Sequence, residues 1–156
     1  KPGSAGKAEK ILLSMMDKYL SGNHQMKPSN ISFNIVMNGW SKSGEKDAAR
    51  RAELLLDNMF HFSARVGDDN LGPDTVSFTC VIDALSRSRN NGAAQRAEKL
   101  LLRMHESKTV APNRLTYNSV INAWSRSGDK GAALRAEKIL LQMENLSQAG
   151  NTNISP

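Results

Sequence analysis

The sequence contains a single cysteine, Cys80, among 156 residues. One thiol cannot form an internal disulfide, and it excludes metal sites built from several cysteines. No apolar run reaches the roughly 18 residues that a membrane-spanning helix needs. The first residues also lack the basic, apolar and small regions of a secretory signal peptide. We therefore expect an intracellular, globular segment of a longer chain, whose hydrophobic residues (39%) suffice for a core.

Motifs for catalysis are missing as well. His24, His61 and His105 lie in three different segments, and neither an HExxH spacing nor a glycine-rich phosphate loop is present. We therefore expect no metal ion, no cofactor, no small-molecule substrate, no membrane and no enzymatic activity. Basic residues do outnumber acidic ones by 21 to 15, which gives a formal charge of +6. A basic chain favours an anionic partner, although the same charge also serves solubility.

The sequence repeats itself at long intervals. Trp40, Leu85 and Trp124 are equivalent positions, 45 and 39 residues apart. An alanine twelve residues after each of them shows the same spacing. A further copy of this alanine, Ala8, indicates that the chain begins inside the second half of an earlier unit. Periods of this length are typical of stacked repeat arrays.

Each unit contains two amphipathic helices. Apolar residues recur at positions i, i+3, i+4 and i+7, the spacing of one helix face. The first-helix stripes are Phe33, Val36, Met37 and Trp40; Phe78, Val81, Ile82 and Leu85; and Tyr117, Val120, Ile121 and Trp124. The second-helix stripes are Ala8, Ile11, Leu12 and Met15; Ala52, Leu55, Leu56 and Met59; Ala97, Leu100, Leu101 and Met104; and Ala136, Ile139, Leu140 and Met143. These stripes predict an all-α solenoid whose units bury their apolar faces against their neighbours.

Polar breaks separate the helices. Gly44 and Gly128 can end the first helix in a left-handed conformation. Four prolines mark the boundaries between units: Pro28, Pro73, Pro112 and Pro156. Glutamates recur beside Arg or Lys on the second helices, and we interpret them as a solvated charge pattern. These are Glu53, Glu98 and Glu137.

The phrase LTYNSVINAWSRSG, followed by an alanine-led helix that ends in methionine and then by Pro-Asn or Pro-Asp, resembles the pentatricopeptide repeat of organelle RNA-binding proteins. The resemblance implies a right-handed superhelical α-solenoid of helix-turn-helix repeats. It divides the chain into half a repeat at 1–29, complete repeats at 30–74 and 75–113, and a truncated repeat at 114–156. These repeats exceed the usual length of about 35 residues. We expect the extra residues in the inter-helix turn KDAARRAE and in FHFSARVGDDNLG, before a boundary proline.

The face of each first helix that lies opposite the apolar stripe is not needed for the core. At about 100° per residue, four positions of each unit fall between about 100° and 180° from the leading aromatic. They are Ile31, Asn34, Asn38 and Lys42; Val76, Thr79, Asp83 and Arg87; and Leu115, Asn118, Asn122 and Arg126. Stacked units would align them in parallel rows on an open surface.

The polar, apolar and basic rows are each expected to have a different role. Asn and Thr are poor helix formers, so their use at Asn34, Thr79 and Asn118 favours a functional role. The apolar positions either pack on the adjacent repeat or flank a flat ligand such as a base; they are Ile31, Val76 and Leu115. The basic positions either complement the helix dipole or contact phosphates; they are Lys42, Arg87 and Arg126.

The residue after each boundary proline is a good helix N-cap: Ser29, Asp74 or Asn113. In the family that this chain resembles, this residue and the one after the preceding aromatic together read one base of single-stranded RNA. Carried over, Asn34 pairs with Asp74, Thr79 pairs with Asn113, and the partner of Asn118 lies beyond Pro156. An Asp carboxylate accepts the N–H of uracil or guanine, whereas an Asn amide can donate to cytosine or adenine. With the family's preference for Asn with pyrimidines and Thr with purines, the repeats imply U, then A, then a pyrimidine, from 5′ to 3′.

The resemblance implies sequence-specific single-stranded RNA binding in a mitochondrion or plastid, in RNA processing, stability or translation. One alternative is a protein-binding scaffold of the tetratricopeptide type, although the signature W-x₂-L-G-x₂-Y is absent. Another is the targeting part of an RNA-processing enzyme.

Overall fold

The structure is a computed structural model that describes residues 3–154. Seven α-helices occupy these residues: α1 (Ser4–Leu20), α2 (Asn30–Ser43), α3 (Ala48–Val66), α4 (Thr75–Arg87), α5 (Ala93–Glu106), α6 (Arg114–Ser127) and α7 (Ala132–Gln148). Three short 3-10 turns accompany them, at His24–Met26, Asp69–Leu71 and Thr152–Ile154. No strand is present in this part of the chain. The boundary residue Pro156 lies outside the described residues.

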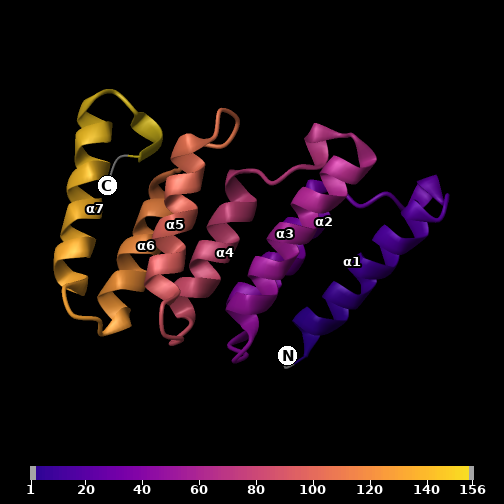
Figure 1. Cartoon of the computed structure of the whole chain (residues 1–156), viewed down its shortest axis with the longest axis horizontal. Coiled ribbons are helices and arrows are strands. Elements are labelled where there is room, and N and C mark those ends of the chain that lie inside the picture. Colours follow the sequence, from indigo (N-terminus) through magenta and orange to yellow (C-terminus); the bar gives the residue numbers. More distant parts are fainter. Residues whose placement is uncertain (1–2, 155–156) are drawn as a thin grey trace.

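The helices form antiparallel hairpins that stand side by side along the long axis of the molecule (Figure 1). The first helices of consecutive repeats pack on one another, α2 on α4 and α4 on α6. Each second helix packs against the first helix of its own repeat and that of the next repeat, as α3 does with α2 and α4. The chain is therefore an α-solenoid of helical hairpins, as predicted.

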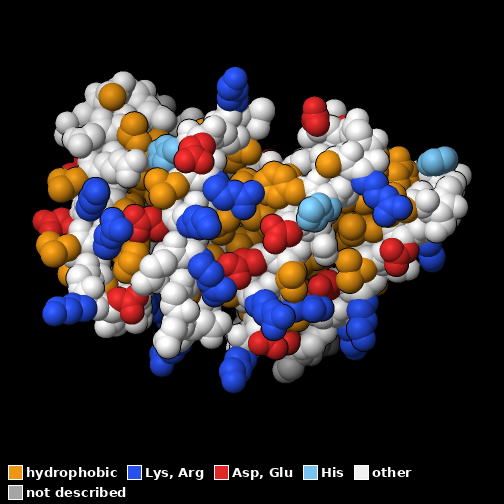
Figure 2. All heavy atoms as spheres, in the orientation of Figure 1, with side chains coloured by type: hydrophobic (Ala, Val, Ile, Leu, Met, Phe, Trp, Pro, Cys, Tyr) orange, Lys and Arg blue, Asp and Glu red, His pale blue; other side chains and the backbone are white. Residues whose placement is uncertain are grey.

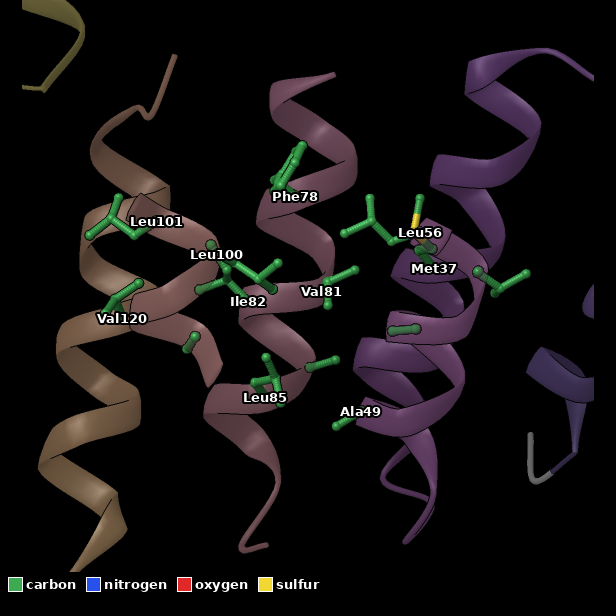
Figure 3. Packing of buried hydrophobic residues seen from close by; sticks show 14 of the residues in the cluster. Met37, Ala49, Leu56, Phe78, Val81, Ile82, Leu85, Leu100, Leu101 and Val120 are labelled. Carbon is green, nitrogen blue, oxygen red and sulfur yellow. The ribbon is translucent and has the colours of Figure 1, made fainter. Parts of the chain in front are cut away.

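The core consists of the predicted stripes. Phe33, Leu85 and Tyr117 are completely buried, and so are three of the recurring methionines of the second helices, Met59, Met104 and Met143. In Figure 3, α4 lies between its neighbours, with Val81 directed toward α2 and α3 and Ile82 toward α5 and α6. Each first helix thus supplies apolar side chains to the interfaces on both of its sides, which is how repeats stabilise one another.

Two stripe residues at the ends of the array depart from this pattern. Ile11 is 64% exposed because, among the described residues, α1 has no first helix of its own repeat beside it. Leu140 is 39% exposed because no first helix follows α7 in the same range. Their counterparts in the first complete repeat, Leu55 and Leu56, are buried. The first leucine position therefore packs within a repeat and the second packs between repeats.

The turns between helices follow the glycine signals. Gly44 and Gly128 end α2 and α6 with φ near 70°, the left-handed conformation that glycine adopts without steric cost. The expectation that KDAARRAE lengthens the turn is wrong, because α3 already begins at Ala48. Each second helix begins eight residues after Trp40, Leu85 or Trp124, so the inter-helix turn is no longer here than in the other repeats.

The long segment before Pro73 also folds back onto the array. It continues α3 to Val66 and then forms the 3-10 turn with Leu71 buried. The Phe62 ring lies edge-on to Tyr19, with ring centroids 5.9 Å apart. Asp68 forms an ion pair with Lys27 at 2.8 Å. The insertion therefore packs on the preceding repeat.

The recurring glutamates form links between repeats, so the interpretation as a solvated pattern is wrong for Glu53 and Glu98. Each forms an ion pair with an arginine of the next repeat: Arg96 lies 3.2 Å from Glu53, and Arg135 lies 3.6 Å from Glu98. Glu137 is exposed. Reasoning along one helix could not detect these pairs, because their partners lie about 40 residues away.

The first of these links is the most buried. Glu9 is 4% exposed and accepts both from Arg51 at 2.9 Å and from Trp40 Nε1 at 3.0 Å. Trp124 donates to Glu98 in the same way at 2.9 Å. In the link between Arg96 and Glu53, Leu85 takes the place that Trp40 and Trp124 have in the other two links. No indole N–H therefore donates to Glu53. Burial raises the pKa of Glu53, partly offset by Arg96.

Candidate functional site

A groove of about 650 Å³ crosses the first helices α2 and α4 and reaches the start of α6. Most of its lining residues come from the rows that the sequence identified and from the boundary caps, and Ile35 and Cys80 are additional. The full lining is Ile31, Asn34, Ile35, Asn38, Lys42, Asp74, Val76, Thr79, Cys80, Asp83, Arg87, Asn113 and Leu115. The structure therefore brings together every candidate residue of the first two repeats. Of the candidates, Asn118 and Arg126 do not line this groove.

Asn34 and Asp74 contact each other directly. The Asn34 amide nitrogen donates to both carboxylate oxygens of Asp74, at 3.1 and 3.2 Å. Asp74 is the N-cap of α4, and its Oδ1 also accepts from the backbone N–H of Ser77 at 2.9 Å. The Ser77 hydroxyl donates to Asn34 Oδ1 at 2.7 Å. These bonds fix both side chains, which come from different helices, before any ligand is present.

We expected the residue after the leading aromatic of each first helix to lie on an open surface, and for two of the three repeats this prediction is wrong. Asn34 is 9% exposed and Thr79 is 5% exposed, because the next first helix packs over each of them. Asn118 is exposed, since no first helix follows α6 among the described residues. Buried polar groups require hydrogen-bond partners, and this requirement explains the choice of Asn and Thr here.

The second pair, Thr79 and Asn113, is joined through Thr116. The hydroxyl groups of Thr79 and Thr116 lie 2.9 Å apart, and Thr79 Oγ1 also donates to the carbonyl of Thr75 at 2.7 Å. Asn113 is the N-cap of α6, and its Oδ1 accepts from the backbone N–H of Thr116 at 3.0 Å. Because the oxygen is committed to the cap, the amide nitrogen is the free end of the side chain. It has no hydrogen bond within the part of the chain that the structure describes.

Apolar side chains border the polar pairs. Ile31, Val76 and Leu115 are 65%, 53% and 62% exposed, so they do not pack away against the adjacent repeat. Each is the second residue of its helix, two residues after the N-cap. Large exposed apolar residues that recur around polar groups are typical of a binding surface.

The basic candidates differ in their surroundings. Lys42 is exposed, lines the groove and has no ion-pair partner among residues 3–154. Arg87 donates through Nε to Asp83 at 2.9 Å. Asp83 in turn accepts from Ser41 of the previous repeat at 3.0 Å. Arg126 is exposed and lines a second hollow instead, next to the turn between α4 and α5.

Sequence reasoning assigned no role to two further groove residues. Ile35 and Cys80 follow Asn34 and Thr79 directly, and both line the groove. Burial raises the pKa of the Cys80 thiol to about 11, and Asp83 and Asp74 add to this effect. The thiol is therefore protonated at neutral pH. Their regular place, two residues after the leading aromatic, was the signal that could have identified them.

Charged side chains of both signs cover one broad face of the molecule (Figure 2). In the face shown in Figure 2, Lys and Arg side chains are spread over the whole length of the molecule and alternate with acidic ones. Residues 3–154 contain no group of His, Cys, Asp and Glu side chains that could hold a metal ion. The same residues include no helix that is both long and apolar enough to cross a membrane.

Comparison with known families agrees with this architecture. The family model described as a pentatricopeptide repeat domain matches residues 64–126, and the one described as a PPR repeat matches residues 115–147. No curated protein and no solved structure matches the chain. With its helical hairpins and the two overlapping matches, the chain belongs to the pentatricopeptide repeat family, whose members are generally RNA-binding proteins.

Proposed function

We propose that the chain binds single-stranded RNA in the groove and reads one base with each repeat. The observation that carries this proposal is the direct contact between Asn34 of α2 and Asp74, the cap of α4. Two polar side chains, one from α2 and one that caps α4, meet at one place in the groove, and Thr79 and Asn113 are joined through Thr116 at the next. One pair per repeat suits a ligand with regularly spaced polar edges. Single-stranded RNA offers such edges because its Watson–Crick groups are unpaired.

Capping supports the assignment of donors and acceptors. The α4 cap, Asp74, keeps Oδ1 on the backbone N–H of Ser77, and its Oδ2 accepts from the amides of Asn34 and Asn30 at 3.2 and 3.4 Å. The N–H of uracil or guanine would replace one of these two amide donors on Oδ2. The α6 cap, Asn113, keeps its oxygen on Thr116 and presents its amide as a donor, which suits adenine or cytosine. Together with the family pattern for Asn34 and Thr79, this gives U followed by A. Asn118 would select a pyrimidine next.

The remaining groove residues fit the other parts of a nucleotide. Exposed Ile31, Val76 and Leu115 would flank the base faces, one at each step. The backbone phosphates would contact Lys42, Arg87 and Arg126. Stacking on flat faces contributes about 1 to 3 kcal/mol per base where the contact is aromatic, and aliphatic contacts are weaker. Two complete base sites therefore predict weak binding by this chain alone.

The proposed cellular role follows from the family. RNA recognition of this kind would serve RNA processing, stability or translation in a mitochondrion or plastid. We propose that the chain supplies the recognition part of such a process and no catalytic group.

The proposal is tested by fluorescence anisotropy with a short labelled RNA that contains the predicted bases. Single-stranded RNA should bind, and the same sequence locked in a duplex should compete poorly. If about three phosphates are neutralised, log K should fall with log salt with a slope of roughly −2, at about −0.7 per phosphate. Replacing Lys42, Arg87 and Arg126 by Ala should remove most of this slope.

A matched control removes the same charge elsewhere. Lys10, Arg50 and Arg65 are exposed residues of the second helices that do not line the groove. Their replacement by Ala should leave the slope nearly unchanged. Equal effects of the two triple variants would contradict the phosphate assignment, and a wild-type chain that does not bind single-stranded RNA would contradict the proposed function.

A further inference from the structure

Arg89 occupies a position where the other repeats have glycine. The residues after the basic position read Ser43-Gly44 in the first repeat and Ser127-Gly128 in the third, but Ser88-Arg89 in the second. Both glycines adopt the left-handed conformation. Arginine rarely does so, and here Ser88 is extended, with φ −72° and ψ 142°. The second repeat therefore follows a different path through its turn and carries a guanidinium group there.

This turn forms one wall of the second hollow, which has a volume of about 330 Å³. Ser88, Arg89 and Asn90 line it from the turn between α4 and α5, and Arg126 and Ser127 line it from the end of α6. Three alanines complete the lining and keep the space open: Ala93, Ala94 and Ala123. The hollow begins one residue after Arg87, which lines the groove.

The charges in this hollow are unbalanced. Arg89 and Arg126 are both exposed, and neither has an ion-pair or hydrogen-bond partner within residues 3–154. No carboxylate is among the lining residues. Asp129 lies in the following turn, where its carboxylate accepts from Gln95 at 2.8 Å. The groove differs in this respect, since Asp83 there already binds Arg87.

The two serine hydroxyls do not compete with the arginines as donors. Ser88 Oγ donates to the carbonyl of Leu85, and Ser127 Oγ donates to the carbonyl of Trp124. The free donors in the hollow are therefore the Asn90 amide and the two guanidinium groups, and guanidinium groups bind phosphate oxygens with two parallel hydrogen bonds.

We propose that Arg89 and Arg126 together bind one backbone phosphate of the RNA as it passes from the second repeat to the third. Arg89 is then an additional phosphate-binding residue of the second repeat, beside the regular residue Arg87, whose Nε is bonded to Asp83. The phosphate lies on the 3′ side of the base that Thr79 and Asn113 read. This inference rests on the RNA binding proposed above.

The test compares Arg89→Ala with Arg65→Ala in the anisotropy assay. Both changes remove one exposed, unpaired arginine, but Arg65 lines neither hollow. Arg89→Ala should weaken RNA binding several-fold at low salt and reduce the salt slope by about 0.7, the value for one phosphate. Arg65→Ala should leave the slope unchanged. Because alanine removes the side chain without requiring a left-handed residue, the fold should persist, and circular dichroism checks this.

Three outcomes decide the matter. A wild-type chain that binds RNA, with Arg89→Ala equal to it in affinity and slope, would overturn this inference alone. A wild-type chain that does not bind RNA would overturn the proposed function together with the inference. Titration with inorganic phosphate serves as the third arm: an affinity similar to that for RNA would identify a free-phosphate site and overturn the assignment to the RNA backbone.

Discussion

Asn34 of α2 donates from its amide nitrogen to both carboxylate oxygens of Asp74, the N-cap of α4. This bond joins the site to the fold, because Asn34 is buried between α2 and α4 and Asp74 caps α4. A single interaction therefore positions a candidate base-reading pair and fixes how two repeats stack.

The first prediction concerns this bond. Asn34→Asp would place a second carboxylate about 3 Å from Asp74 in a buried site, where like charges repel strongly. We expect the free energy of unfolding at neutral pH to fall by roughly 1 to 3 kcal/mol. Repulsion raises the pKa of the carboxylate pair above the unfolded value, so the loss should shrink as the pH falls through the raised pKa. Chemical denaturation at several pH values measures both effects.

The control for this variant is Asn118→Asp. Asn118 holds the equivalent position in α6, but it is exposed and has no hydrogen bond within the described residues. Its replacement should change stability by no more than about 0.5 kcal/mol. If the two substitutions changed the free energy of unfolding equally, the prediction that the bond between Asn34 and Asp74 stabilises the fold would be wrong.

The second prediction concerns the buried glutamate links. Trp40→Phe keeps an aromatic ring but removes the donor to Glu9, whose side chain is only 5% exposed. Leaving a buried carboxylate short of one donor should cost about 1 to 3 kcal/mol. Trp124→Phe should cost less, because the Glu98 side chain is 19% exposed and water can replace the indole. Thermal or urea unfolding of both variants gives the comparison, and a larger loss for Trp124→Phe would refute it.

The third prediction concerns pH. His105 Nε2 lies 2.8 Å from the Tyr117 hydroxyl, and burial lowers the pKa of His105 below its ordinary value of 6.5. The unfolded chain therefore binds this proton more readily than the folded chain does. Stability from this group is fully present above pH 6.5 and falls as the pH drops toward the folded-state pKa. His105→Gln should flatten the pH dependence of unfolding in that range, and an unchanged profile would exclude the effect.

The sequence predicted the helices and the core because both depend on local periodicity. The stripe from Tyr117 to Trp124 and the glycines at the ends of α2 and α6 needed no knowledge of distant residues. The caps were equally local: Ser29, Asp74 and Asn113 cap their helices as predicted, and the structure adds a complete capping box at each.

What the sequence missed depends on contacts between repeats. Asn34 was expected on an open face, since the sequence of α2 alone does not show that α4 packs over it. Glu9 and Arg51 are 42 residues apart in the chain and meet only after stacking. The unequal surroundings of Lys42 and Arg87 have the same origin, because the acid at position 83 is an asparagine in the equivalent places of the other repeats.

The most direct test of one-base-per-repeat reading is the substitution Asn113→Asp. Aspartate caps a helix as well as asparagine does, so α6 should remain intact. The free amide donor becomes a carboxylate acceptor, which opposes the acceptor of adenine and matches the N–H of guanine.

The measurement is competition binding at low ionic strength, with RNAs that differ only at the second base. The ratio of affinities cancels the phosphate contribution. The wild-type chain should prefer A to G, and Asn113→Asp should prefer G to A, with a change in the ratio of about 5- to 150-fold for 1 to 3 kcal/mol. An unchanged preference for A would contradict the account and leave Asn113 only as the cap of α6.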